Sequence, residues 1–297
     1  MSVKGKSLAK PIGSARRLMG RLGRVNRRSR RPSSPPSPRP LGGARLAEAL
    51  ITGWQPLQRL DADGFAVLRS RGITRRAHSI LALEPPTGTA ELAAALDRVE
   101  SLVTRVGESP VHRILEGVTP PQLETLLAER GDEPVGDSEV LELPLRGTLP
   151  RPHPSAVIST GALDEDWFEA AWRLAPRDGE QARGTMHDIL AGTPAIQVRL
   201  PGEGTDAAVG RAALVTAGKE TLVVMNMIAV DPAQRRRGLG RSVSTTLLAL
   251  AAVQGARRAL LEVEVDNTPA RTLYRSLGFR RIGGYHYRVR TGPGSPA

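Results

Sequence analysis

The chain of 297 residues contains no cysteine. Disulfide bonds, zinc sites with thiolate ligands and a nucleophilic thiol are therefore excluded, and nothing indicates an oxidising compartment. A long apolar run is also missing, because the longest, around residues 247–253, is far shorter than the roughly 20 residues that cross a bilayer. The basic first residues lack the apolar core of a secretory signal. We expect a cytoplasmic protein without membrane contact.

Acidic residues are absent from residues 1–40, which hold twelve of the 42 lysines and arginines. Without these twelve, 30 basic residues face 30 acidic ones, so the formal charge of +12 belongs to this tail. Its Arg, Ser and Pro cannot bury enough apolar surface to offset the ordering entropy, which predicts disorder. Three interpretations are open: an arm attracted to RNA or a membrane, an amphipathic targeting segment, or a start site placed upstream of the true one at Met19 or Val25.

Behind the tail, the length of the chain predicts about two domains. Four prolines between residues 144 and 154 mark the boundary, because proline fits neither a strand ladder nor a helix interior. We therefore predict a disordered basic tail at 1–40, an α+β accessory domain at 41–150 and a second domain at 151–297. In the accessory domain, hydrophobic periodicity predicts strands at 64–70 and 77–83 and helices at 89–105 and 120–130.

The second domain has the better-defined elements. Gly255 stands where a C-cap glycine is favoured, and Thr268 with Pro269 suits the N-cap and first position of the last helix. Gly278 and Phe279 suit a Schellman turn at its end. Helices are predicted at 164–174, 181–190, 238–254 and from Thr268, and strands at 195–200, 207–217, 221–230 and 258–265.

The strand ending at Val230 leads through a loop at 231–237 into a helix whose first residues include Gly238 and Gly240. Glycine lets the backbone approach a ligand closely, and the unpaired N–H groups of a helix start bind phosphate. A tight turn without a ligand is the plain alternative. A dinucleotide-binding fingerprint also has acidic residues about 20 residues later. It is disfavoured because Val243 occupies its third glycine position and seven residues separate the strand from the first glycine.

Four motifs between residues 227 and 279 together resemble the GNAT superfamily of N-acetyltransferases, most closely the ribosomal-protein N-terminal acetyltransferases. They are Ile228-Ala-Val230, then Arg235-Arg-Arg-Gly-Leu-Gly240, then Leu261-Glu-Val-Glu-Val-Asp-Asn267, and then Ala270-Arg-Thr-Leu-Tyr274 with Leu277-Gly-Phe279. The resemblance implies an α+β GNAT fold, with a mixed, mostly antiparallel central sheet flanked by helices. It also implies an acyltransferase that transfers acetyl from acetyl-CoA to a primary amine.

In that family two strands diverge and the pantetheine arm of the cofactor lies between them. The resemblance implies that the strand ending at Val230 diverges from the one ending at Val265, and that backbone N–H groups beyond it bind pyrophosphate. Two plain alternatives are open: a solvated basic loop at 235–237, and Asn267 as a helix cap. The residues expected to bind cofactor are Ile228, Ala229, Val230, Arg235, Arg236, Arg237, Gly238, Leu239, Gly240, Arg241 and Asn267.

Direct transfer requires a neutral amine, yet amines with a pKa of roughly 8 to 10 are mostly protonated at neutral pH, so a base is needed. Strand alternation puts Glu262 and Glu264 on one face. The resemblance implies that Glu262 is the base, acting through water, with Glu264 as a substitute. It implies that Tyr274 is the acid that protonates the departing CoA sulfur. The structural alternatives are an ion-paired or solvated Glu262 and a Tyr274 packed on the core face of its helix.

The remaining features leave more alternatives open. Residues 41–150 resemble the degenerate first half of bacterial tandem GNAT proteins, with an unrelated α+β domain as the alternative. The five histidines show no metal-ligand spacing, so we expect no metal. The acceptor, a small-molecule or protein amine, is not specified, nor is the acyl group. An alternative function is an acyl-CoA sensor, or a nucleic-acid or ribosome-associated protein that binds through its tail.

Overall fold

The computed structural model describes residues 41–147 and 149–290. The predictions for the tail at 1–40 lie outside these residues. Everything described belongs to one compact unit. None of the described helices is both long and apolar enough to cross a membrane.

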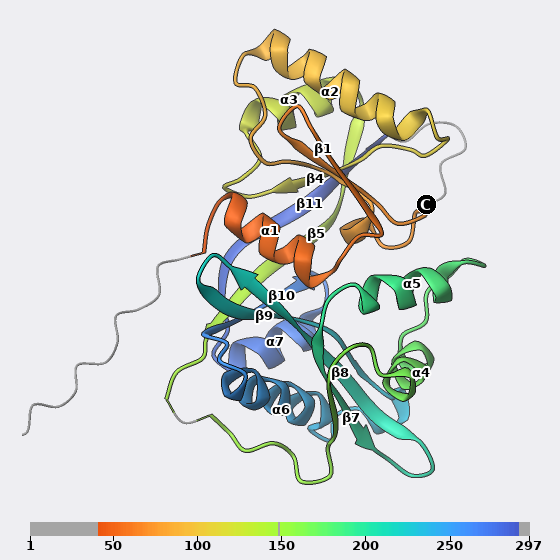
Figure 1. Ribbon diagram of the computed structural model, residues 1–297, viewed down its shortest axis with the longest axis vertical. Coiled ribbons are helices and arrows are strands. Elements are labelled where there is room, and N and C mark those ends of the chain that lie inside the picture. The colour runs from red at the N-terminus through yellow and green to blue at the C-terminus, as the bar shows by residue number, and fades with distance from the viewer. Residues whose placement is uncertain (1–40, 148, 291–297) are drawn as a thin grey trace, which may run out of the picture. The chain divides into compact units, whose positions relative to one another are not determined.

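An eleven-stranded sheet organises the described residues, in the order β1-β2-β3-β4-β11-β5-β10-β9-β8-β7-β6 (Figure 1). The pairs β3–β4 and β9–β10 are parallel, and the other neighbours are antiparallel. Helices flank this sheet, so the predicted mixed, mostly antiparallel α+β architecture is confirmed.

We call residues 41–150 the N-terminal segment and residues 151–297 the C-terminal segment. The N-terminal segment contributes α1 (Ala44–Gly53), β1 (Gln58–Ala62), β2 (Phe65–Arg69), η1 (Arg75–Ala77), β3 (Ile80–Ala82), α2 (Thr89–Thr104), β4 (Val111–Leu115), α3 (Pro121–Glu129) and β5 (Asp132–Pro144). The C-terminal segment contributes β6 (Val157–Gly161), α4 (Glu165–Leu174), α5 (Ala182–Ala191), β7 (Ala195–Pro201), β8 (Asp206–Ala217), β9 (Glu220–Val230), η2 (Pro232–Gln234), α6 (Leu239–Val253), β10 (Arg258–Glu264), α7 (Thr268–Ser276) and β11 (Arg280–Arg290).

The predicted helices at 89–105 and 120–130 are confirmed as α2 and α3. The predicted strand at 77–83 is shorter, because Thr74 adopts a φ of 56° and the chain forms the 3₁₀ turn η1 before β3 begins at Ile80. The sequence did not predict α1, β1, β4, β5, β6 or β11. In β5, Pro134 and Gly136 are poor strand formers that hide the buried run behind them.

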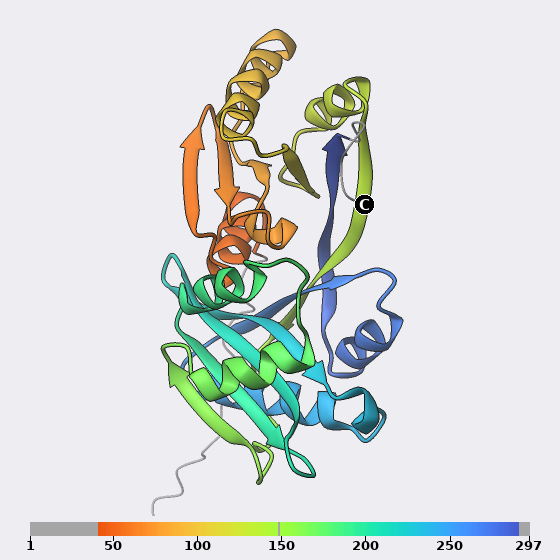
Figure 2. The ribbon, with the colours of Figure 1, turned by 90° about the vertical axis from the view of Figure 1, so that its right-hand side faces the viewer.

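Strands of the two segments pair with each other, as Figure 2 shows for the long, adjacent β5 and β11. β5 lies between β10 and β11, with its Val140 opposite Glu262 on one side and Gly283 on the other. β11 pairs in turn with β4 of the N-terminal segment. The predicted boundary near residue 150 falls in the connection between β5 and β6. The division into two domains stays a prediction, whereas the strands of both segments belong to the same sheet.

Helices cover both faces of the sheet around the fork described below. α6 and α7 lie on one face, where Leu247 packs with Leu261. α1 lies on the opposite face, where Leu50 packs with Leu260, and α4 and α5 join it through a cluster that includes Val209. Successive β10 residues thus point to opposite sides, as strand geometry requires. We call these the α6 face and the α1 face.

The N-cap of helix α7 lies one residue earlier than predicted. Asn267, not Thr268, is the N-cap, and its side chain accepts a hydrogen bond from the Ala270 N–H at 3.2 Å. The amide-type oxygen of asparagine reaches the third helical N–H, and Thr268 is therefore already inside the helix. The predicted Schellman turn is confirmed, because the Phe279 N–H donates to the Tyr274 carbonyl at 3.1 Å.

Candidate active site

A strained residue interrupts β9 just before Ile228, the first residue of that strand predicted to bind the cofactor. Met227 has a φ of 50°, a left-handed conformation that residues other than glycine rarely adopt. Arg211 of β8 lies opposite Asn226, but Val209 lies opposite Ala229, so β9 carries one extra residue here. This β-bulge bends the strand and re-aims the residues that follow it.

β9 and β10 diverge beside the bulge. They pair at three positions, the last of which places Leu261 opposite Met225. Beyond it, β9 continues to Val230 beside β8, while β10 continues through Glu262 and Glu264 beside β5. Backbone groups of β9 on the side of β10 lose their strand partner at this point. The implied divergence of the two strands is therefore confirmed, and we call it the fork.

Backbone amides without a backbone partner lie at the start of α6. Arg236 and Gly238 both have positive φ, 61° and 79°, which curls the loop ahead of the helix. Within the described residues, the first backbone bond of α6 runs from the Ser242 N–H to the Gly238 carbonyl at 3.0 Å, so the N–H groups of Leu239 to Arg241 have no backbone partner. Free amides at a helix start bind phosphate.

Gly240 permits close packing of this helix start. A Cβ atom added there would lie 3.4 Å from Leu273 Cδ2 of α7 and 3.7 Å from Val230 Cγ2 of β9. The helix start is thus held directly against the end of β9. Of the predicted phosphate-binding side chains, Arg235, Arg236 and Arg237 are exposed and have no ion-pair partner in the described part of the chain. Arg241 is also exposed and donates to Ser276 Oγ at 2.6 Å.

Tyr274 lies on the α6 face in the core beside the fork. Its side chain is buried, and its ring packs edge-on against Phe279 with centroids 5.8 Å apart. Burial raises the pKa of Tyr274 to about 12, so the phenol keeps its proton at physiological pH. The core packing foreseen as the structural alternative is present. It is compatible with the role of proton donor, which stays a prediction.

Glu262 lies on the α1 face, and its carboxylate is bound by two arginines. Its side chain is 2% exposed. Arg113 of β4, itself 1% exposed, donates to one carboxylate oxygen, and Arg76 of η1 lies 3.4 Å from the other. Glu264, two residues on, is exposed. The predicted pair of carboxylates therefore divides into one buried, ion-paired group and one solvated group.

Aromatic rings surround the arginine that pairs with Glu262. The Arg113 guanidinium lies 3.9 Å from the centroid of the Tyr285 ring. Burial is the largest single influence and lowers the pKa of Arg113, but Glu262, Tyr285 and Tyr287 together raise it above the ordinary value. Burial likewise raises the pKa of Tyr285 and that of Tyr287, so both phenols stay neutral. The charged groups of the cluster are therefore the Glu262 carboxylate and its two arginine partners.

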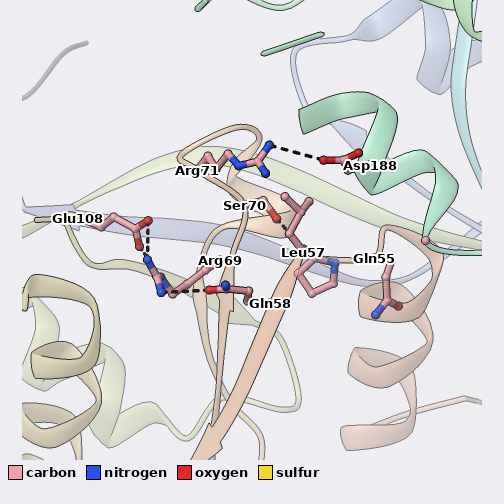
Figure 3. Close-up of a pocket in the computed structure, with 10 residues that line it drawn as sticks. Gln55, Leu57, Gln58, Arg69, Ser70, Arg71, Glu108 and Asp188 are labelled. Atoms are coloured by element: carbon pink, nitrogen blue, oxygen red, sulfur yellow. Dashed lines mark hydrogen bonds and ion pairs between the residues drawn. The ribbon is translucent and has the colours of Figure 1, made fainter. Parts of the chain in front are cut away.

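Local sequence patterns carry no signal for Arg113 or Arg76, because they precede Glu262 by 149 and 186 residues. Arg76 belongs to the loop between β2 and β3. The start of this loop lines a pocket. A polar pocket of about 690 Å³ opens beside Ser70 and Arg71 of that loop (Figure 3). Its charged walls are paired, Arg69 with Glu108 and Arg71 with Asp188 of α5. The pair of Arg71 and Asp188 joins the N-terminal segment to α5.

Asn267, predicted to contact the cofactor, caps α7 as described above. Its contact with the cofactor stays a prediction. His112 lies with Glu100 and Asp132 in a buried cluster whose ligand-type atoms are within 4.8 Å of one another. Arg290 binds both carboxylates, at 3.4 Å and 3.0 Å, and thereby supplies positive charge to the cluster.

The geometry agrees with comparisons to known proteins. Residues 44–290 match the family model described as "Probable histone acetyltransferase Rv0428c C-terminal". The chain belongs to this family. The match extends across both segments, so the family includes the N-terminal segment as well as the motifs from which the GNAT resemblance was drawn.

Relatives and solved structures carry related names. A mycothiol acetyltransferase of Catenulispora acidiphila is 29% identical over 63% of this chain and 64% of its own length. The N-alpha-acetyltransferase RimI of Mycobacterium tuberculosis is 45% identical over 22% of this chain and 40% of its own length. A GCN5-related N-acetyltransferase of Kribbella flavida has a TM-score of 0.63 and 20% identity, with 85% of this chain and 98% of that one covered.

These findings confirm the GNAT fold and the resemblance predicted from the motifs. The match to the solved structure shows the fold, while its low identity says nothing of substrate. The chain spans less than two thirds of the length of either curated relative. The mechanism and acceptor of this chain therefore have to be inferred from its own residues.

Proposed function

We propose that this protein is an N-acetyltransferase that transfers the acetyl group of acetyl-CoA directly to a primary amine. The observation that carries the proposal is the fork between β9 and β10, which has the free amides of α6 on one face and the Glu262 carboxylate on the other. A thioester lying in the fork would reach both faces. The names of its relatives support acetyl transfer as the reaction class.

In this proposal the cofactor binds on the α6 face. The pyrophosphate accepts hydrogen bonds from the amides at Gly238 to Arg241, and the exposed arginines at 235–237 lie where they can pair with the nucleotide phosphate. The pantetheine arm takes the place of the missing strand partner along Ile228, Ala229 and Val230. Asn267 lies at the start of α7 and contacts the same arm.

The chemistry requires one proton acceptor and one donor. The neutral amine attacks the thioester carbonyl, the new C–N bond forms, and the C–S bond breaks without a covalent enzyme intermediate. Glu262 accepts the amine proton through water, and Tyr274 gives a proton to the departing sulfur. The Tyr274 phenol carries its proton at physiological pH and therefore has one to give.

A second candidate function is acyl-CoA sensing without turnover. One observation favours it: both oxygens of Glu262 face guanidinium groups, which compete with a proton for the carboxylate lone pairs. A sensor would bind the cofactor through the same amides and acetylate nothing.

Acetyl-CoA binding to the full-length chain, measured by titration calorimetry, tests the cofactor site. Gly240→Arg places a bulky side chain where a Cβ atom already meets Leu273 at 3.4 Å, and we expect it to abolish binding. Gly184→Arg, at an exposed helical glycine with open space around it, is the matched control and should bind normally. Absence of binding by the wild-type chain would refute the proposal.

Turnover separates an enzyme from a sensor. We expect the wild-type chain to acetylate amines, with Glu262→Gln and Tyr274→Phe each reducing kcat by about 10²- to 10⁴-fold, the typical contribution of a positioned acid or base. Acetyl-CoA binding should be retained in both variants. Binding without acetylation of any amine would support the sensor instead.

A further inference from the structure

Residues of the N-terminal segment cover the fork on the α1 face. Trp54, at the end of α1, and Ala77 of η1 belong to one apolar cluster with Met227, in the bulge of β9, and Ala229, just after it. The cofactor is proposed to bind from the opposite face. An acceptor that reaches the thioester must therefore pass residues of the N-terminal segment, among them Arg76, which directly precedes Ala77.

The two arginines on Glu262 differ in how they are held. Arg113 is 1% exposed and hydrogen-bonded to the carboxylate, which balances its charge. Arg76 is 24% exposed, and its distance of 3.4 Å to Glu262 is long for a charge-assisted hydrogen bond. The centre of its guanidinium lies over the Trp54 ring, 4.3 Å from the ring centroid. Stacking of this kind holds the guanidinium plane while its edges stay available for hydrogen bonding.

Positive charge is in surplus around Arg76. Arg177, in the loop after α4, is exposed and interacts electrostatically with both Arg76 and Glu264. Its guanidinium donates to the Pro176 carbonyl at 3.1 Å. Tyr285 and Tyr287 lie near the Arg76 guanidinium as neutral phenols. Three guanidinium groups thus surround two carboxylates on the acceptor side of the fork.

We propose that Arg76 is a specificity-determining residue that binds a carboxylate on the acceptor, so that the acceptor class is an amine that also carries a carboxylate group. This inference rests on the proposed acetyl transfer. A carboxylate forms a bidentate pair with an accessible guanidinium, and the Arg76 side chain is 24% exposed. When Arg76 pairs with the acceptor, it leaves the Glu262 oxygen it contacts, and that oxygen is free to accept the amine proton. Arg113 keeps Glu262 in place.

The proposal assigns different tasks to the two segments. The C-terminal segment binds the cofactor with backbone amides, and the N-terminal segment chooses the acceptor with a side chain. It also explains how a carboxylate with two arginine partners serves as a base, because one partner is exchanged for the substrate. Amines without a carboxylate do not pair with Arg76, so Arg76 stays paired with Glu262.

Paired acceptors test the idea. We would measure acetylation of a panel of amino acids and dipeptides, each with its carboxamide twin, by the full-length wild-type chain and by Arg76→Gln, Arg76→Lys and Arg75→Gln. Arg75 lies in the same turn but beside Tyr287, and is the matched control. In the wild type we expect kcat/KM to favour the carboxylate member of a pair by about 10- to 100-fold, the usual effect of a charged hydrogen bond.

Arg76→Gln should abolish that preference by raising KM for the carboxylate member, while the carboxamide keeps its KM. Arg76→Lys should retain part of the preference, and Arg75→Gln all of it. Equal turnover of both twins by the wild type, an equal loss on both in Arg76→Gln, or acetylation of no member of the panel by a chain that binds acetyl-CoA would each overturn the inference. Failure to bind acetyl-CoA would instead overturn the proposed function itself.

Discussion

The two faces of the sheet at the fork differ in the chemical groups that form the candidate site. On the α6 face the candidate cofactor site consists of backbone N–H groups, glycines and exposed arginines that lie within one stretch of chain. On the α1 face the site consists of side chains buried in ion pairs and against aromatic rings, and they come from α1, η1, β4, β10 and β11. Both faces are packed, but the ligand-binding groups proposed on the α6 face are backbone N–H groups, and those on the α1 face are charged side chains.

This difference predicts which substitutions affect ligand binding and which affect folding. Backbone donors keep their place whatever the neighbouring side chains are, so changes on the α6 face should affect ligand binding more than folding. Buried charged side chains satisfy one another, so removal of one member leaves its partner unpaired in a low-dielectric interior. Changes on the α1 face should therefore be costly for folding.

The largest expected effect is at the ion pair of Arg113 and Glu262. Arg113→Met leaves the buried Glu262 carboxylate with the more distant Arg76, and we expect the free energy of unfolding to fall by about 3–5 kcal/mol. The double variant Arg113→Met with Glu262→Leu removes both charges and should recover most of that loss. Urea unfolding of the wild type, both single variants and the double variant measures the coupling. A double variant as unstable as Arg113→Met alone would show that packing, not charge, is at stake.

A second buried arginine on the α1 face has no carboxylate partner in the described part of the chain. Arg211 of β8 is 1% exposed and donates to the carbonyls of Leu190 and Thr193 at 2.9 Å and 2.7 Å, and to that of Gly53 at 3.3 Å. Burial lowers its pKa to about 10. It caps the ends of α1 and α5, where helix dipoles favour a positive charge.

Arg211→Met therefore tests whether the α1 face depends on paired charge or on satisfied polar groups. Three buried carbonyls would lose a donor, and we expect the free energy of unfolding to fall by about 2–4 kcal/mol. Arg183→Met, an exposed arginine on α5 paired with Glu169, is the control and should change it by less than about 1 kcal/mol. If both variants cost the same in urea unfolding, the buried hydrogen bonds of Arg211 contribute no more to stability than an exposed ion pair.

The same contrast decides how much of the site was predictable from sequence. The free amides at the start of α6 and the Schellman turn depend on residues close together in the chain, where glycine and helix-cap patterns carry the information. The fork lies between strands that pair Met225 with Leu261, and it was implied only by the resemblance to the GNAT family. Arg76, Arg113 and Arg211 depend on contacts between elements that are far apart in sequence. An isolated arginine in a strand or turn has no signature of its own. The polar start of β5 likewise hid the strand that links the two segments.

Even local patterns left the choice between neighbouring caps open. Both Asn267 and Thr268 are favoured N-caps, and the hydroxyl with a following proline favoured Thr268 in the prediction. Asn267 is the cap in the structure because β10 ends at Glu264 and the chain turns before α7. Only the tertiary position of the turn separates the two.

The smallest expected effect is at this cap, on the α6 face. Asn267→Ala removes the bond to the Ala270 N–H and should lower the free energy of unfolding by about 1 kcal/mol, whereas Thr268→Ala, inside the helix, should change it little. Acetyl-CoA affinity separates capping from a direct contact. If Asn267 also binds the cofactor arm, its variant loses affinity while Thr268→Ala does not, and if it only caps, affinity follows stability. A loss at Asn267 as large as that at Arg113 would break the contrast between the faces, because an exposed cap would then matter as much for folding as a buried ion pair.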